Sequence, residues 1–253
     1  MSNLFNTITE YCEINRNEVF YSYMNYRLWN EETIKKWRLG FFPENYNELI
    51  KFCNNKSISN KDLEEQCIIK YNNSFFYNRV IFPVFDSKND IISITGRVLN
   101  DNKPKYFNTV FDKGKNLYGI NYAKESIRKN DLVYLFEGNA DVITAHQYEI
   151  KNSVCFMGTA ITIDQLILLS RYTKNIIIML DKDEAGFKAL KAFNKRMENY
   201  KNIIKEMNIK RVFLDKTKDT DEFLKLYGKN EFVSYIETFL KDKDKQYRLS
   251  SVA

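Results

Sequence analysis

Acidic side chains follow two short apolar runs that have the character of buried strands. Glu137 comes directly after the run 132–136, and Asp181 and Asp183 follow the run 176–180. Short apolar runs followed by helical patterns are typical of buried parallel strands, and ligands gather where such strands end. Carboxylates with no Cys or His beside them suit a hard divalent ion, Mg²⁺ or Mn²⁺. The sequence therefore predicts a divalent-metal site at one edge of a sheet.

The composition is that of a folded chain with a mild excess of positive charge. Of 253 residues, 44% are hydrophobic and 15% are aromatic, which allows one large domain or two modest ones. The net charge of +6 permits nucleic-acid binding but does not show it. No apolar run approaches the roughly 18 residues of a membrane span, and the start lacks the pattern of a signal peptide. We therefore expect a cytoplasmic protein with no membrane partner.

The four cysteines are widely scattered, and the chain has a single histidine, His146. No C-x-x-C pair occurs, so we expect no zinc site. Free cysteine is among the most often buried residue types. Buried thiols are therefore the interpretation that we favour for Cys12, Cys53, Cys67 and Cys155. His146 falls in a helical pattern and is expected to be an ordinary helix residue.

The first half of the chain combines helical patterns with one hairpin. Asn30 is a good N-cap for a helix at 31–37, with acidic residues in the first turn and lysines later. The runs 79–86 and 91–99 have strand character, and the polar residues between them predict a hairpin turn. The segment 100–119 is polar, basic and aromatic, which indicates a surface loop that makes contacts.

The second half alternates strands and helices, which favours a mainly parallel sheet. A helix at about 121–129 precedes the first acidic strand end. After the second acidic strand end we expect a long helix at roughly 184–207, a strand at 210–214 and a helix that opens at Asp221. The predicted fold class is α/β: a mixed α+β amino-terminal part, then an α/β part around the parallel sheet.

Three short motifs follow successive predicted strands: Glu137-Gly138, Gly158-Thr159 and Asp181-x-Asp183-x-x-Gly186. In this order they resemble the TOPRIM domain, the metal-binding fold of bacterial-type primases, topoisomerases and some nucleases. Asp-x-Asp-x-x-Gly alone is a weak signal. The order of all three motifs, each after a strand, is what carries the resemblance.

The chain resembles the catalytic core of bacterial DnaG-type primases over roughly residues 20 to 225. The resembling segments are Arg27 to Pro43, Arg79-Val80-Ile81-Phe82-Pro83-Val84, Gly96-Arg97-Val98-Leu99, Pro104-Lys105-Tyr106-Phe107-Asn108, Lys113-Gly114-x-x-Leu117-Tyr118-Gly119 and Lys218-Asp219-Thr220-Asp221-Glu222-Phe223. The resemblance implies an amino-terminal primase-core subdomain with a basic nucleic-acid-binding face at 1–128. It also implies a TOPRIM catalytic subdomain at 129–225, followed by a carboxyl-terminal helix and charged tail at 226–253.

The resemblance also implies which acidic residues hold metal. The implied ligands are Glu137, Asp181, Asp183, Asp219 and Asp221, of which the first three are catalytic. Glu137 is a general base or a ligand, with a pKa that its acidic neighbours raise. Asp141 is expected to hold a water near the metal, and the supporting glycines are Gly138, Gly158 and Gly186. The alternative is ordinary helix N-capping, which has most weight at Asp141, Asp219 and Asp221.

A basic set is implied for binding the template strand and the incoming nucleoside triphosphate: Arg79, Arg97, Lys105 and Lys113. Guanidinium and ammonium groups suit phosphate contacts, and Tyr106, Phe107 or Tyr118 are candidates for stacking on bases. The alternative is a solvated basic face with aromatic residues in the core.

The function that we expect is synthesis of short RNA primers on single-stranded DNA from nucleoside triphosphates, with Mg²⁺ or Mn²⁺, no zinc and no organic cofactor. Two alternatives stay open: a TOPRIM metal-dependent nuclease, and a non-catalytic nucleic-acid-binding or decoy module acting on a host primase. The resemblance places the protein in a bacterial or phage-infected cell.

The chain also departs from the family pattern. It has no cysteines for the usual zinc-binding module and little length after the core for a helicase-docking domain. We expect a minimal phage- or mobile-element-like core that depends on a replicative helicase or a separate template-selecting protein. Leu28 replaces a common glycine, Asn139-Ala140 replace bulkier residues, and Thr220 replaces a common proline.

Overall fold

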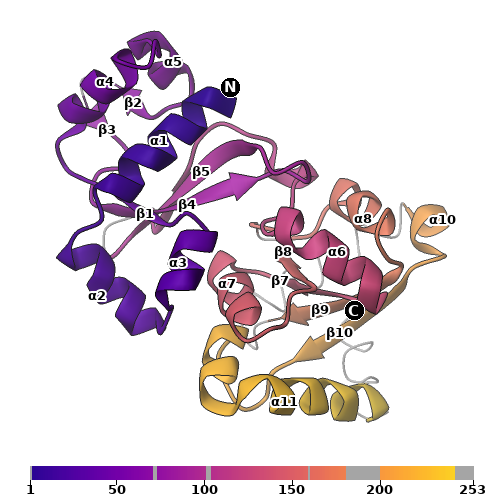
Figure 1. Ribbon diagram of the computed structural model, residues 1–253. Coiled ribbons are helices and arrows are strands. Elements are labelled where there is room, and N and C mark those ends of the chain that lie inside the picture. Colours follow the sequence, from indigo (N-terminus) through magenta and orange to yellow (C-terminus); the bar gives the residue numbers. More distant parts are fainter. Residues whose placement is uncertain (1, 71–72, 101–103, 159, 181–199, 243–253) are drawn as a thin grey trace. The chain divides into compact units, whose positions relative to one another are not determined.

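The chain divides into two compact units, Met1–Phe111 and Asp112–Ala253 (Figure 1). The computed structural model describes residues 2–70, 73–100, 104–158, 160–180 and 200–242. We expected a boundary at 128/129 because the motifs change there. The two units are instead defined by which residues pack together, and their boundary lies at 111/112. The helix α6 (Ile120–Asn130) packs against β8 (Ser153–Cys155) and so belongs with the second unit. None of the helices in the described ranges is long and apolar enough to span a membrane.

The first unit has five helices in its described part. They are α1 (Ser2–Ile14), α2 (Glu18–Arg27), α3 (Glu31–Lys36), α4 (Tyr46–Asn54) and α5 (Asn60–Glu65). The prediction of a helix capped by Asn30 is confirmed, because the Asn30 side chain accepts a hydrogen bond from the backbone N–H of Thr33 at 2.8 Å. This contact satisfies one of the N–H groups that the first turn of a helix leaves open.

An antiparallel sheet forms the core of the first unit. Its order is β1-β4-β5-β6, with β1 (Gly40–Phe42), β4 (Arg79–Phe85), β5 (Ile91–Val98) and β6 (Tyr106–Asn108). The predicted hairpin is confirmed as β4 and β5. The sequence analysis missed β1, because three residues are too few to show a strand period. A separate two-stranded sheet pairs β2 (Ile69–Lys70) with β3 (Asn73–Ser74).

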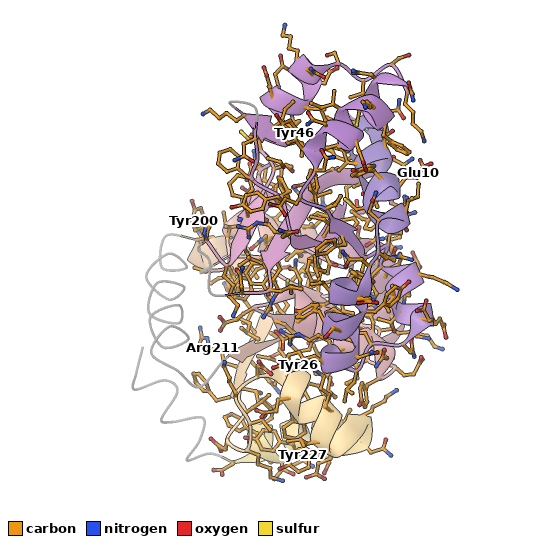
Figure 2. The ribbon with its side chains drawn as sticks, turned by 90° about the vertical axis from the view of Figure 1, so that its left-hand side faces the viewer. Glu10, Tyr26, Tyr46, Tyr200, Arg211 and Tyr227 are labelled. Carbon is orange, nitrogen blue, oxygen red and sulfur yellow. The ribbon has the colours of Figure 1, made fainter. Side chains whose placement is uncertain are left out.

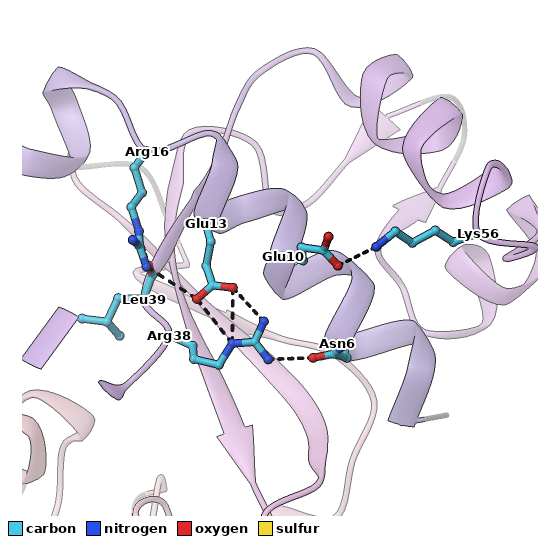
Figure 3. A network of polar contacts seen from close by, with 7 residues as sticks. All are labelled: Asn6, Glu10, Glu13, Arg16, Arg38, Leu39 and Lys56. Carbon is cyan, nitrogen blue, oxygen red and sulfur yellow. Dashed lines mark hydrogen bonds and ion pairs between the residues drawn. The ribbon is translucent and has the colours of Figure 1, made fainter. Parts of the chain in front are cut away.

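A polar network fixes α1 to the turn that leads into β1 (Figure 3). The Glu13 carboxylate of α1 accepts a hydrogen bond from Nη2 of Arg38 at 2.7 Å, and Nη1 of Arg38 donates to Asn6 at 2.6 Å. Nε of Arg16 donates to the carbonyl of Leu39 at 2.8 Å. Arg38 has a φ of 51°, a left-handed conformation that costs free energy in a residue with a Cβ. These contacts hold the turn in place.

A fully parallel sheet forms the core of the second unit. Its order is β10-β9-β7-β8, with β7 (Val133–Phe136), β9 (Asn175–Leu180) and β10 (Asn208–Phe213) beside β8. Around it lie α6, α7 (Asn139–Gln147), α8 (Ile163–Ser170), α10 (Lys201–Ile204) and α11 (Thr220–Lys241). The α/β class predicted from the sequence is confirmed. The long helix expected at 184–207 falls mostly outside the described residues.

Candidate functional site

Three adjacent parallel strands build an acidic edge in the second unit. β9 pairs with β7 on one side and with β10 on the other, so the carboxyl ends of all three lie at the same edge. Glu137 follows β7 directly, and β10 leads through a short loop to Asp219. Asp181, Asp183 and Gly186, which follow β9 in the sequence, lie outside the described residues. Strand order therefore brings the ends of the strands that precede the predicted acidic segments to one edge of the sheet.

Glu137 and Gly138 connect β7 to α7. Glu137 is half-buried, and a Cβ added at Gly138 would lie 2.8 Å from Oδ2 of Asp141. A larger residue at this position would therefore displace the Asp141 carboxylate, which takes the space beside Gly138. Asp141 is 9% exposed, and its Oδ1 accepts a hydrogen bond from the backbone N–H of Asp221 at 2.9 Å. Asp141 thus links the end of β7 to the start of α11.

Asp219 and Asp221 stand at the start of α11 and have protein partners there. Asp219 is the N-cap, and its Oδ1 accepts from the backbone N–H of Glu222 at 2.9 Å. The carboxylate of Asp221, which is 5% exposed, accepts from the Thr144 hydroxyl and, at 2.7 Å, from Nζ of Lys225. The capping role that we weighed is present at Asp219. An ionised carboxylate offers about four lone-pair sites, so these contacts leave others for a metal or water.

The donor atoms at this edge fit a hard divalent ion. They are carboxylate oxygens, and the thiol nearby, Cys155 of β8, is buried and donates to Oδ1 of Asn139 at 3.2 Å. Burial raises the pKa of the Cys155 thiol well above its usual range, so it does not supply a thiolate ligand. Within the described ranges, no three His, Cys, Asp or Glu side chains are arranged to hold a metal. Among the described residues, the edge thus offers carboxylate oxygens and no thiolate.

Lys113 is placed by a short helical turn and by Gln165. Lys113 opens the 3₁₀ turn η1 (Lys113–Lys115), and the Gln165 amide donates to the carbonyls of Lys113, Asn116 and Phe156 at 3.0, 2.9 and 3.1 Å. Desolvation by burial lowers the pKa of Lys113 below its ordinary value. The sequence analysis missed Gln165, whose signal is the capping box that it forms with Thr162 at the start of α8.

Gly158 lies in the segment between β8 and α8. A Cβ added there would have its nearest contact at 3.6 Å, an ordinary van der Waals distance to the carbonyl of Phe156. Packing of the described residues therefore does not require glycine at this position. The role of Gly158 as a supporting glycine of the metal site therefore stays a prediction from the sequence.

Arg97 lies among tyrosines on the sheet of the first unit. Its Nη1 donates to the Tyr106 hydroxyl at 2.6 Å, and its guanidinium carbon lies 5.2 Å from the ring centre of Tyr23 and 5.3 Å from that of Tyr106. Cation–π contacts of this kind hold a guanidinium in a fixed plane. Arg97 is half-buried, and its Nε lacks a hydrogen-bond partner among the described atoms. It is therefore a donor that is already oriented.

Arg79 is inside the first unit and not on its surface, which differs from the expectation. It is 7% exposed, and its guanidinium donates to the carbonyls of Phe75 and Pro104, each at 2.9 Å. Burial lowers the pKa of Arg79. Because Pro104 precedes Lys105, Arg79 braces the backbone that carries Lys105. From sequence alone, an arginine in a strand is expected on the surface. Only the tertiary structure shows that Arg79 is buried and supports the backbone through its hydrogen bonds.

A hollow of about 910 Å³ lies between α2 and the end of β5 in the first unit. Its lining includes Tyr23, Tyr26, Arg97 and Lys105, so cations and aromatic rings face one space. Tyr26 is 73% exposed (Figure 2), and its ring stacks on Tyr23 with centroids 6.4 Å apart. The sequence analysis did not single out Tyr26. In the sequence, only its neighbour Arg27 could have indicated a role for Tyr26. The Arg27 guanidinium lies over the rings of both Tyr23 and Tyr26.

The three aromatic residues predicted to stack on bases lie in different environments. Tyr118 is fully buried, so it belongs to the core alternative. The Phe107 ring stacks on Phe75 with centroids 4.9 Å apart and is half-buried. Tyr106 is 37% exposed and lies beside Arg97. Tyr26, which lines the hollow, and Tyr106, which binds the lining residue Arg97, are therefore exposed aromatic residues that could stack on a base there.

Comparison with protein families gives two adjacent matches that together span most of the chain. The family described as DNA primase catalytic core, N-terminal domain, matches residues 9–124. The family described as Toprim-like matches residues 134–224. The segments that carry the basic residues and the acidic edge fall in the first and second match, respectively.

Curated relatives point the same way. The chain is 38% identical over 233 residues to the DNA primase of Clostridium acetobutylicum, covering 87% of this chain and 37% of that protein. It is 30% identical over 242 residues to the DNA primase of Halalkalibacterium halodurans, covering 90% of this chain and 40% of the relative. The chain thus spans less than half of the length of these relatives.

Solved structures match the whole fold. A DnaG primase catalytic domain bound to single-stranded DNA superposes with a TM-score of 0.83 at 26% identity, covering 100% of this chain and 90% of that one. The zinc-binding and RNA polymerase domains of the Aquifex aeolicus primase give a TM-score of 0.82 at 26% identity, covering 98% of this chain and 65% of that one.

Proposed function

This chain belongs to the family of DnaG-type DNA primase catalytic cores, and from that premise we propose that it synthesises short RNA primers on single-stranded DNA. The reaction joins a 3′-hydroxyl to the α-phosphate of the next nucleoside triphosphate. The observation that supports this most is the parallel order β10-β9-β7, which brings acidic chain segments to one sheet edge.

Glu137, Asp181 and Asp183 hold Mg²⁺ or Mn²⁺ in this proposal, and Asp219 and Asp221 complete the acidic cluster. When bound, the metal lowers the pKa of the attacking hydroxyl and neutralises phosphate charge. Glu137 directly follows the buried strand β7, which positions its backbone, and its carboxylate also accepts a proton in this proposal. The proposed site uses no zinc and no organic cofactor, and the carboxylates predicted for it suit Mg²⁺ or Mn²⁺.

Template and nucleotide contacts come from the basic residues of both units. In the first unit, Arg97 and Lys105 bind phosphates at the hollow, and Tyr106 and Tyr26 stack on bases. A DnaG catalytic domain of the same fold is known bound to single-stranded DNA. In the second unit, Lys113 contacts phosphate of the strand or of the incoming triphosphate. Arg79 supports Lys105 from inside.

Primer synthesis from nucleoside triphosphates on varied single-stranded templates, with Mg²⁺ or Mn²⁺, tests this function. Glu137→Gln and Asp181→Asn should each lower the rate at least about 100-fold, since residues next to a metal's ligands alone are worth 10- to 100-fold. Asp164→Asn is the matched control, because Asp164 is an exposed acid of the same unit.

Three outcomes contradict the proposal in different ways. If the protein makes no primers on any template, even with a replicative helicase added, the hypothesis of a stand-alone primase is excluded. Metal-dependent cleavage of DNA without nucleoside triphosphates identifies a nuclease. Biological activity that survives Asp181→Asn and Asp183→Asn identifies a non-catalytic module.

A replicative helicase or a separate template-selecting protein is the partner that we propose, and co-purification with this chain tests it.

A further inference from the structure

Four side chains form a network between α7 and α11, here called the α7–α11 network: the buried Asp141, Thr144 and Asp221, and the partly buried Lys225. Thr144 and Lys225 donate to the two carboxylate oxygens of Asp221, and the backbone N–H of Asp221 donates to Asp141. Neither Thr144 nor Lys225 belongs to the motifs that carry the primase resemblance. Both belong to the second unit, so the network is internal to one compact body.

Burial makes these contacts strong constraints. Thr144 is fully buried, Asp221 is 5% exposed, and the Lys225 side chain is 15% exposed. Buried carboxylates are costly unless they are paired and hydrogen-bonded. Lys225 supplies the positive charge, one helical turn after Asp221. The first turn of α11 adds the favourable field of a helix N-terminus.

The α7–α11 network contacts the two described acidic segments of the edge, those of Glu137 and Asp219. Oδ2 of Asp141 occupies the space beside Gly138, the residue that follows Glu137. Asp219, two residues before Asp221, opens α11 as its N-cap. A shift of Asp221 is therefore transmitted to Asp219 along the backbone and to the Glu137 segment through Asp141.

We propose that Lys225 and Thr144 are positioning residues for divalent-metal binding at the acidic edge. Neither contacts the metal. They hold Asp221, and Asp221 and Asp141 hold the segments that carry Asp219 and Glu137. This inference rests on the proposed metal site, and it assigns a role to two residues that contact neither the metal nor the substrate.

Binding of Mn²⁺ to the whole chain, measured by electron paramagnetic resonance of the free ion, tests the inference without relying on activity. Lys225→Met and Thr144→Val should each weaken Mn²⁺ binding by about 10-fold, the lower end of the range for residues that orient metal ligands. Lys225→Arg should restore binding to within about threefold of the wild type, because a guanidinium keeps the charge and donors.

Lys229→Met is the matched control. Lys229 lies four residues after Lys225, just past the non-helical Gly228, and is exposed. Its Nζ donates to the carbonyl of Glu149 at 2.9 Å, outside the α7–α11 network. Its variant should bind Mn²⁺ like the wild type. In primer synthesis, Lys225→Met should need about 10-fold more Mn²⁺ for half-maximal rate and reach a similar rate at saturation.

Circular dichroism separates positioning from folding. If Lys225→Met and Thr144→Val are folded and bind Mn²⁺ like the wild type, the network is packing only and the inference is overturned. It is also overturned if both variants are unfolded, since the network then serves the fold alone. A wild-type chain that binds no Mn²⁺ instead removes the proposed metal site itself.

Discussion

At the scale of single residues, backbone conformation identifies a position that favours glycine although the chain has another residue there. Leu28 ends α2 with φ 55° and ψ 31°, the left-handed conformation that glycine adopts at helix ends. Its side chain is 60% exposed. The resemblance to primases marked this position as a common glycine, and the structure gives the physical reason.

Leu28→Gly should therefore stabilise the first unit. Relief of the left-handed conformation offsets the extra chain entropy of glycine, and the net gain is expected to be about 0.5–1 kcal/mol. Urea unfolding measures it. Leu28→Ala keeps the Cβ and serves as the control, so a glycine variant no more stable than the alanine variant would refute the explanation.

Lys113 should give binding of single-stranded DNA a distinctive pH dependence. Its folded pKa is lowered by burial, so its ammonium loses its proton at a lower pH than an exposed lysine. The charge is present below that pKa and is lost as pH rises through it. Phosphate binding by the wild type should weaken toward alkaline pH before that of Lys113→Arg, which stays charged. Fluorescence anisotropy across pH 7–10 checks this, and identical profiles would exclude a Lys113–phosphate contact.

At the scale of elements, helix α1 approaches the edge strand β1 so closely that only glycine fits between them. A Cβ added at Gly40 would lie 2.6 Å from the backbone carbon of Cys12. Since backbone cannot move aside cheaply, Gly40→Ala should destabilise the first unit by about 1–3 kcal/mol.

Thermal unfolding measures the effect of Gly40→Ala. Gly158→Ala is the control, because its nearest new contact is an ordinary 3.6 Å. Equal melting temperatures for the two variants would show that α1 adjusts its position at little cost.

At the scale of the whole molecule, a net charge of +6 would attract any nucleic acid and would hide the effect of a single contact. The salt dependence of binding separates them. If Lys105 neutralises one phosphate, Lys105→Gln should reduce the slope of log affinity against log salt by about 0.7.

The control for Lys105 is Lys61→Gln, a charge-matched change at an 82% exposed side chain of α5 in the same unit. It should leave the slope unchanged. A Lys105→Gln slope equal to that of the wild type assigns Lys105 to a solvated basic face.

By itself, the sequence predicted most of the longer described elements and their order, but not the short strands β1 and β6, the second of which lies in the segment expected to be a loop. Local signals sufficed for the α3 cap at Asn30 and the β4–β5 hairpin, because they depend on neighbours in the chain. The order of the acidic segments, each after an apolar run, predicted the parallel edge. Asp181 and Asp183 remain predictions from sequence, outside the described residues.

Only the tertiary structure decided which polar residues are buried and which partners they bind within the protein. Arg79 has the type of a phosphate contact, yet its hydrogen bonds go to backbone carbonyls of its own unit. Asp221 stays a proposed metal ligand, and its carboxylate also binds Thr144 and Lys225. Tyr118 proved to be core, and Tyr26 proved to be exposed. Burial and hydrogen-bond partners depend on residues far apart in sequence, such as Thr144 and Asp221, so no local pattern contains them.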